Sequence, residues 1–396
     1  SVIADDSDVL PFSHGLCHDV KSVRPLQPIQ RSDLQVSTVR RTPRAAPRPA
    51  RLKKDTPSET LRFSVTVAVQ STFVSVNTGV PSRGSFRVRA MNSSFTRVVN
   101  PASSLGRIGT PGLITTMRPL LNGGLSLMCP VPPGTRTETV HRHLGDEQVR
   151  GEWVWGPRVG QRRIADTRVI YYLHGSGYVI CSPRTHRGLV SRLSQRTDRV
   201  AFSLDYRLGP KHRFPAAGDD TVRGYQWLLD QGYRPENIIV AGDSAGGHLA
   251  MDLLAANQAQ SRPQPRAMLL FSPLMDPTFG LALAREARGF RDPYFSARLG
   301  QHFLEMYTAG ARADHPRMTV SLRPTDDLPT TLIQVGAREV MADDARFLHA
   351  ALVAAGAQSE LQQWPDQGHV FQLFPALSPE SRQAVSEAAR FVNSVA

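Results

Sequence analysis

Short apolar runs alternate with helix-like stretches from about residue 140 onwards, which leaves few folds open to this part of the chain. The runs are continuously apolar, as expected for strands that are covered on both faces. We expect strands at 168–173, 200–205, 237–241, 267–271, 331–335 and 360–364. Helices are expected between them at 186–196, 219–231, 246–258, 343–355 and 379–395. This order predicts a mostly parallel sheet flanked by helices, with Trp153 in an antiparallel edge strand and the active site at the carboxyl ends of the strands.

The strand expected at 237–241 runs directly into Gly242-Asp243-Ser244-Ala245-Gly246-Gly247, and a helix is expected to follow. This is the G-x-S-x-G pattern in a strand–turn–helix context, where the serine acts as a nucleophile. The glycines allow a very tight turn in which neighbouring backbones leave no room for a Cβ atom. Such a turn raises the Ser244 hydroxyl above the sheet, beside the positive end of a helix. A chance match in a glycine-rich turn is the alternative, and this placement disfavours it.

A second loop, His174-Gly175-Ser176-Gly177, follows the strand that ends near Leu173. Its small residues allow backbone amides to point inward, where they and the amide of Ala245 could hold the oxyanion of a tetrahedral intermediate. We interpret His174 as a residue that shapes this loop, because it lies on the oxyanion side of the site.

The chain order of this kind of site, serine then acid then histidine, requires a late histidine. His369 fits, because it follows the last expected strand. The acid is expected after the strand at 331–335, where Glu339, Asp343 and Asp344 compete. Asp343 and Asp344 open the next helix, where capping is their simpler role. We therefore expect Glu339 to be the acid, with Asp343 as the alternative.

Together these residues predict acyl transfer. His369 would take the proton of Ser244 as the hydroxyl attacks an ester carbonyl, and Glu339 would fix the imidazole tautomer and stabilise the imidazolium. An acyl-enzyme would form and then be hydrolysed by water. This chemistry needs no metal or organic cofactor, and we expect none.

Four ordered motifs over residues 135–396 carry a family resemblance: His174–Gly177, Asp205–Pro210, Phe214–Ala217 and Gly242–Gly247. This part of the chain resembles the hormone-sensitive-lipase family of α/β-hydrolases, which includes bacterial carboxylesterases and relatives of arylacetamide deacetylase. Actinobacterial lipases and esterases are the most similar in style. The resemblance implies an α/β-hydrolase fold with an N-terminal helical cap, and activity on short- to medium-chain carboxylic esters. It also implies that Gly175 and Ser176, with Ala245, supply the oxyanion amides.

Two positions depart from the family pattern. The oxyanion loop of the family usually reads His-Gly-Gly-Gly, whereas the third position here is Ser176, of which only the backbone amide is needed. The usual acid is an aspartate followed by Pro-Leu, whereas this chain has Glu339-Val340-Met341. Glutamate is longer by one methylene and serves as the acid in other triads.

The first third of the chain is strongly basic. Residues 31–140 contain 16 Lys and Arg against 4 Asp and Glu, a net charge of +12 in a chain whose total is +13. Helix formation is opposed there by Pro43, Pro47 and Pro49. We expect a disordered, Pro- and Arg-rich leader over residues 1–60.

The domain organisation that we expect continues with an N-terminal cap or extension over 61–135 and the α/β-hydrolase catalytic domain over 136–396. Within the extension, β-branched residues predict a strand at 61–76, and apolar residues predict short helices over 104–128. The first 100 residues do not resemble the cap of the family.

The expected partner is a small-molecule ester. The basic leader could also favour an anionic membrane surface, and the apolar stretch at 104–128 could lie on lipid. No aromatic residues are interleaved with the basic ones, so no nucleic-acid partner is expected. The three cysteines, Cys17, Cys129 and Cys181, form no CxxC pair, which suits a reducing compartment. The chain starts with Ser and shows neither a signal-peptide pattern nor an apolar run of about 18 residues, so we expect a trimmed, cytoplasmic protein, with membrane association as the alternative.

Other functions remain open from the sequence. The same triad would serve amide hydrolysis or deacetylation of a small molecule, and the fold also occurs in non-catalytic ligand receptors. An interaction protein dominated by its basic leader is a third alternative. The preference for acyl-chain length depends on residues that either line an acyl pocket or pack in the core, namely Phe279, Phe290, Tyr294, Phe295 and Phe303.

Overall fold

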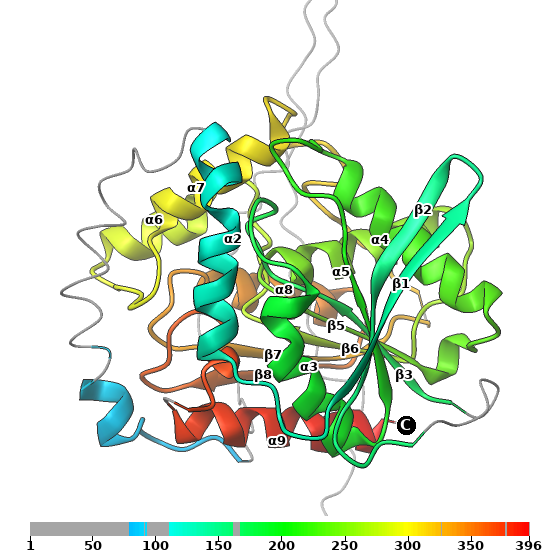
Figure 1. Ribbon diagram of the computed structural model, residues 1–396. Coiled ribbons are helices and arrows are strands. Elements are labelled where there is room, and N and C mark those ends of the chain that lie inside the picture. Colours follow the sequence, from blue (N-terminus) through cyan, green and yellow to red (C-terminus); the bar gives the residue numbers. More distant parts are fainter. Residues whose placement is uncertain are drawn as a thin grey trace, which may run out of the picture. The chain divides into compact units, whose positions relative to one another are not determined.

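The computed structural model describes residues 79–90, 92, 111–160, 167–325, 327–376 and 378–395. Its centre is one eight-stranded sheet with the order β1-β2-β4-β3-β5-β6-β7-β8 (Figure 1). β1 pairs antiparallel with β2, and β2 antiparallel with β4, whereas all further neighbours pair parallel. The predicted mostly parallel α/β sheet is therefore confirmed.

The strands are β1 (Arg136–Leu144), β2 (Glu147–Trp155), β3 (Val169–Leu173), β4 (Val200–Leu204), β5 (Ile238–Asp243), β6 (Ala267–Phe271), β7 (Thr330–Gly336) and β8 (Ser359–Trp364). The α-helices with described bounds are α2 (Pro111–Met128), α3 (Pro183–Thr197), α4 (Ala216–Asp230), α5 (Ala245–Ala259), α6 (Gly280–Ala287), α7 (Ala297–Thr308), α8 (Ala342–Ala354) and α9 (Pro379–Ser394). Two short 3-10 helices, η2 (Pro235–Asn237) and η3 (Phe371–Leu373), lie in loops. The six predicted parallel strands and five predicted helices all form, with bounds that differ by at most three residues.

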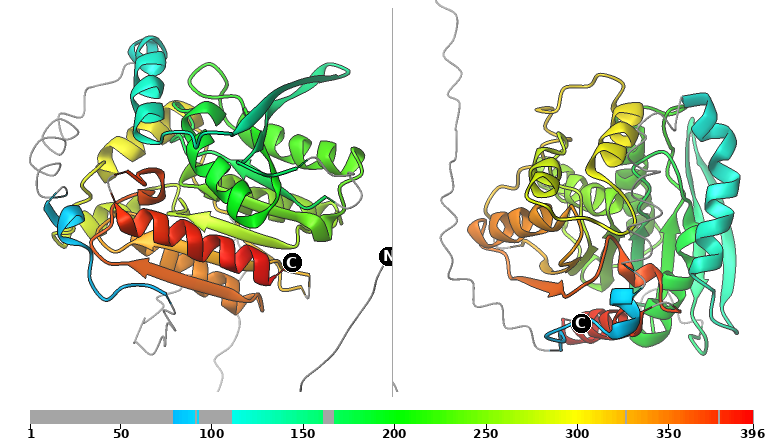
Figure 2. Two further views of the ribbon diagram at one scale, coloured as in Figure 1. Left: turned by 60° about the horizontal axis from the view of Figure 1, so that its bottom comes forward. Right: turned by 90° about the vertical axis from the view of Figure 1, so that its left-hand side faces the viewer.

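Alternate residues of the central strands enter two separate cores. On β3, Val169, Tyr171 and Leu173 pack in the core that contains residues of α4, α5 and α8. Ile170 and Tyr172 pack in the core that contains residues of α3 and α9. The sheet is thus covered on both faces, which explains the uninterrupted apolar runs in its strands. In the right-hand view of Figure 2, β8 lies between α8 (orange) and α9 (red).

The prediction for the antiparallel edge was only partly right. Trp153 does lie on an antiparallel strand, β2, but β1 pairs with its far side and is the true edge. A two-residue turn joins β1 and β2, with Gly145 at a φ of +64°. Only Val140 of β1 is buried, so the strand is polar on both faces and lacks the apolar pattern that marks a half-buried strand.

Helix α2 differs from the short helices that the sequence predicted, because it runs unbroken through Pro119 for 18 residues. Its buried side is narrow and includes Ile114, while Leu113, Leu120 and Leu127 are 44%, 68% and 84% exposed. No helix among the described residues is both long and apolar enough to cross a membrane. The expected leader at 1–60 and strand at 61–76 lie outside the described residues, and the division into three segments stays a prediction.

The central strands carry the stability of this fold, which a pair of leucine truncations can test. Leu269 of β6 is fully buried, so Leu269→Ala is expected to lower the free energy of unfolding by about 2–5 kcal/mol. Leu127→Ala removes the same atoms from an exposed position and is expected to change it by less than about 0.5 kcal/mol. Denaturant unfolding followed by circular dichroism measures both values, and equal costs would contradict the described core.

Candidate active site

Ser244 sits on the tight turn between β5 and α5, as the sequence predicted. Its backbone has a φ of +52° and a ψ of −118°, which is unfavourable for a residue with a side chain. Glycine is required on both sides: a Cβ on Gly246 would lie 1.9 Å from the carbonyl oxygen of Leu173, and one on Gly242 would lie 2.6 Å from that of Gly246. This close packing places the Ser244 hydroxyl at the N-terminus of α5, where the helix dipole favours negative charge.

His369 reaches Ser244 from the loop after β8. Its Nε2 atom lies 3.0 Å from the Ser244 Oγ atom, within hydrogen-bond distance. The histidine side chain is 14% exposed, so it keeps an open side towards solvent or substrate. The structure thus brings together two residues that lie 125 positions apart in the chain.

Glu339 approaches the other side of the imidazole from the loop after β7. Its Oε2 atom lies 3.5 Å from His369 Nδ1, and its side chain is fully buried. The Ser272 hydroxyl donates a 2.8 Å hydrogen bond to the same Oε2 and accepts one of 3.1 Å from the Val370 amide. Ser272 therefore ties the acid to the histidine loop, a role for which the sequence carries no motif.

The ionisation of His369 reflects this surrounding. Burial disfavours the imidazolium and lowers its pKa, but the hydrogen bond and charge of Glu339, helped by the charge of Asp292, outweigh this effect. The pKa of His369 is therefore raised above the ordinary value of 6.5.

The two competing acids point elsewhere. Asp343 forms ion pairs with Arg285, Arg288 and Arg346. Asp344 accepts the amides of Met275 and Asp276, both at 2.9 Å, and so holds the loop after β6. Of the three carboxylates that the sequence offered, the structure brings Glu339 alone within reach of His369.

The loop after β3 lies beside the turn of Ser244, but its backbone amides differ in whether they already form a hydrogen bond. The Gly175 amide donates a 2.9 Å hydrogen bond to Asp243 Oδ1, so it is already engaged, which counts against the prediction that Gly175 is an oxyanion donor. The next residues, Ser176 and Gly177, continue the turn, and Gly177 has a φ of +52°. Ser176 is not among the described residues with a positive φ, so its Cβ is accommodated without strain.

The side chain of Ser176 is bound into the protein rather than directed at substrate. Its hydroxyl lies 2.7 Å from the Tyr206 hydroxyl and accepts a 2.7 Å hydrogen bond from the Tyr178 amide. Tyr206 donates in turn to the carbonyl oxygen of His174, whose ring stacks on the tyrosine at 4.3 Å. The buried His174 is thus part of the loop's own scaffold, which is the arrangement expected of a loop-shaping residue.

Asp243, beside the nucleophile, is a buried anchor that the sequence analysis did not identify. Besides the Gly175 amide it accepts a 2.7 Å hydrogen bond from the Tyr172 hydroxyl, and its Oδ2 atom lies 3.2 Å from Nε2 of His186. Burial alone would raise the pKa of this carboxyl. The charge and hydrogen bond of His186, together with the hydrogen bonds from the Tyr172 hydroxyl and the Gly175 amide, keep that pKa below its usual value. The charged carboxylate of Asp243 therefore joins the loop His174–Gly177 to the turn that carries Ser244.

Of the five aromatic residues proposed for an acyl pocket, two adjoin the site. The Phe295 ring lies 4.8 Å from the His369 ring, and Phe303 packs against Gly177. Phe279 is buried in the core, Phe290 lies under the Arg285 guanidinium and Tyr294 packs on Phe374.

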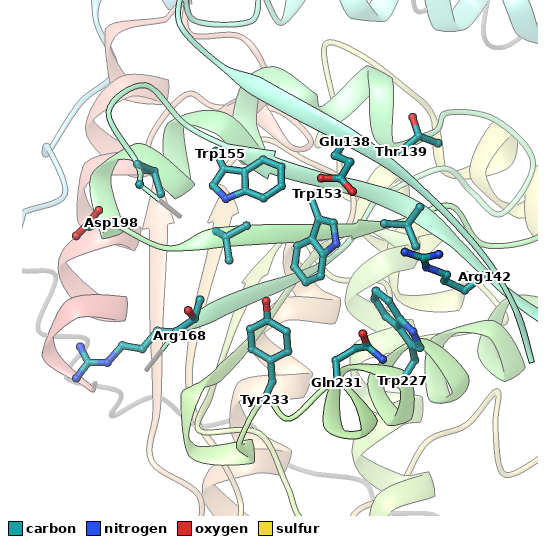
Figure 3. Close-up of a pocket in the computed structure, with 15 residues that line it drawn as sticks. Glu138, Thr139, Arg142, Trp153, Trp155, Arg168, Asp198, Trp227, Gln231 and Tyr233 are labelled. Carbon is teal, nitrogen blue, oxygen red and sulfur yellow. The ribbon is translucent and has the colours of Figure 1, made fainter. Parts of the chain in front are cut away.

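A pocket at the opposite end of the parallel strands is separate from this site. Figure 3 shows its lining by Trp153, Trp155, Trp227 and Tyr233 together with charged side chains such as Glu138. None of Ser244, Glu339 and His369 lines it. Within the described residues no three His, Cys, Asp or Glu side chains are grouped to hold a metal ion.

Curated relatives share most of this chain. The carboxylesterase/phospholipase LipF of Mycobacterium tuberculosis is 34% identical over 316 residues, which cover 73% of this chain and 82% of that protein. An acetyl-hydrolase of Streptomyces hygroscopicus is 35% identical over 262 residues, covering 66% of this chain and 83% of the relative.

Solved structures agree with the sequence relatives. An esterase from the bacterial hormone-sensitive lipase family superposes with a TM-score of 0.67 and 31% identity, covering 78% of this chain and 98% of that one. EstE5, soaked with p-nitrophenyl butyrate, gives a TM-score of 0.65 and 30% identity, with coverages of 78% and 99%. A family model for the α/β-hydrolase fold matches residues 170–373. The chain therefore belongs to the α/β-hydrolases and, within them, to the esterases related to bacterial hormone-sensitive lipase.

Proposed function

We propose that this esterase hydrolyses carboxylic esters of short- to medium-chain acids with Ser244 as nucleophile, His369 as base and Glu339 as acid. The proposal rests on the 3.0 Å distance between His369 Nε2 and Ser244 Oγ at the N-terminus of α5. A serine hydroxyl is a weak nucleophile by itself, and a neighbouring base is what activates it.

In the first step His369 Nε2 takes the Ser244 proton as Oγ attacks the ester carbonyl carbon. Glu339 holds the ring through Nδ1 and stabilises the imidazolium, which then donates its proton to the leaving alcohol. Water, deprotonated by His369, attacks the acyl-enzyme, and the acid leaves as Ser244 recovers its proton. The 3.5 Å distance between Glu339 and Nδ1 is long for a hydrogen bond, and such contacts commonly shorten when substrate binds.

For the oxyanion we propose the amides of Ser176 and Ala245, with Gly177 as the third donor. Gly175 is left out because its amide is bound to Asp243. Gly177 directly follows Ser176 in the turn, and it belongs to the loop whose amides the sequence offered for the oxyanion. Donors fixed in advance stabilise the developing charge without reorganising during the reaction.

The substrate class draws support from the relatives. The names of two relatives, a carboxylesterase/phospholipase and an acetyl-hydrolase, describe removal of acyl groups, and a third was soaked with a butyrate ester. Phe295 and Phe303 flank the site on its histidine and oxyanion sides, and their bulk favours a small acyl group. The acetyl-hydrolase relative also makes deacetylation a second candidate, and rates on matched acetyl esters and acetamides decide between them.

The nucleophile assignment is tested by Ser244→Ala, which removes the only atom proposed to carry the acyl group. The variant is expected to lose both the burst of p-nitrophenol from p-nitrophenyl butyrate and covalent labelling by a fluorophosphonate. Ser394→Ala, at the exposed end of α9, is the matched control and should keep both signals. Labelling that persists in the Ser244→Ala protein would contradict the assignment.

The acid is identified by comparing Glu339→Gln with Asp343→Asn. The first variant removes the charge that stabilises the imidazolium, and kcat is expected to fall by up to about 10⁴-fold. The second breaks ion pairs on a partly exposed carboxylate and should change kcat by less than about threefold. Steady-state kinetics on p-nitrophenyl butyrate measure both, and the reverse order would make Asp343 the acid.

The pH dependence of kcat/KM reports on His369. Because the base must be neutral to accept a proton, kcat/KM should fall as the pH drops through the pKa of His369. The raised pKa places the midpoint of this acid limb above 6.5. In the residual activity of Glu339→Gln the midpoint should move to lower pH, because burial then acts with less opposition. A midpoint that stays fixed would contradict coupling between Glu339 and the base.

A further inference from the structure

The segment between α6 and α7 meets the histidine loop at two points. Asp292 Oδ2 accepts a 3.1 Å hydrogen bond from the backbone amide of His369. Three residues later, the Phe295 ring lies 4.8 Å from the imidazole. One short stretch of chain thus contacts both the backbone and the side chain of the histidine.

Further hydrogen bonds hold the Asp292 carboxylate in this position. Its other oxygen, Oδ1, accepts the Tyr294 amide at 2.8 Å and the Phe295 amide at 3.4 Å, so the carboxylate folds its own turn as well. The residue is 2% exposed. In the part of the chain that the structure describes, no lysine or arginine forms an ion pair with it.

Burying a carboxylate whose partners are backbone amides costs free energy of folding. Burial also raises the pKa of Asp292 to about 6. The charge of His369 lowers this pKa, and the charge of Glu339 raises it. When they are ionised, Glu339 and Asp292 each raise the pKa of His369, as does Asp243.

We propose that Asp292 is a positioning residue for the base: it holds the backbone of His369, and thereby keeps the imidazole within reach of Ser244. The inference rests on the proposed function of Ser244 and His369. The loop between α6 and α7 would then take part in the reaction through this contact. The rival interpretation is that Asp292 merely folds the 292–295 turn.

The test compares Asp292→Asn with Asp344→Asn. Both residues are buried carboxylates that accept two or more backbone amides, but only Asp292 contacts His369. Both variants should unfold at lower denaturant concentration than the wild type. Asp292→Asn alone is expected to lower kcat, by about tenfold to a hundredfold, with little change in KM, because a displaced base slows the chemical step.

The pH profile of kcat/KM separates positioning from folding. Removing the negative charge beside the imidazole should shift the acid limb of Asp292→Asn to lower pH, whereas that of Asp344→Asn should match the wild type. A purely structural role would lower the amount of folded enzyme without moving the limb. An unchanged kcat per folded molecule together with an unmoved limb would overturn the proposal.

A second variant keeps the test decisive if the amide variant does not fold. Asp292→Glu retains the charge and displaces the carboxylate by one methylene, so kcat should fall while the acid limb stays in place. Full kcat in the glutamate variant would also overturn the proposal. The proposed function is judged separately, since an inactive wild type or a labelled Ser244→Ala protein would refute it whatever the Asp292 variants do.

Discussion

The site depends on how closely α5 approaches the end of β3. At Gly246 the two backbones leave no space for even one additional carbon atom, because it would lie 1.9 Å from the Leu173 carbonyl oxygen. This contact lets the helix start directly beside the strand end, so that Ser244 and the loop from His174 to Gly177 become neighbours. Within the sheet, Leu173 of β3 pairs with Gly242 of β5. This pairing also holds the end of β3 next to the turn that carries Ser244. Ser244, the proposed nucleophile, and the candidate oxyanion amides are therefore aligned by backbone packing.

The remaining groups come from loops, and buried polar contacts hold those loops in place. Asp243 binds the oxyanion loop, Ser272 joins the acid loop to the histidine loop, and Arg285 donates to the carbonyl oxygens of Glu339 and Ala337. Each of these groups would cost free energy if it were buried without a partner, so loss of one contact destabilises the loop that it holds. Two of the residues that hold these loops, Arg285 and Asp292, lie in the chain between β6 and β7. Arg285 binds the loop of Glu339, and Asp292 binds the backbone of His369. This segment is thus part of the framework of the site.

The sequence predicted those parts of the fold whose physical signal is local. Mainly apolar runs identified five of the six parallel strands, the more polar β8 was placed by the strand–helix alternation, and the glycine pattern identified the turn at Ser244. Strand β1 was not predicted because a polar edge strand has no apolar period. Helix α6, which has only eight residues, and helix α7 were not predicted either. The family resemblance implied that the Gly175 amide helps to hold the oxyanion, and its hydrogen bond to Asp243 could not be foreseen because it joins residues 68 positions apart. Asp292 and Ser272 were overlooked for the same reason: their partners are far away in the chain, and neither belongs to a motif.

The backbone of Ser244 also restricts which hydroxyl-bearing residue can occupy the turn. At a φ of +52° and a ψ of −118° a side chain branched at Cβ is disfavoured more strongly than an unbranched one. Threonine carries the same hydroxyl group, yet its extra methyl makes it a poorer fit here, while cysteine is unbranched like serine. The choice of nucleophile at this turn is thus limited by backbone conformation before reactivity is considered.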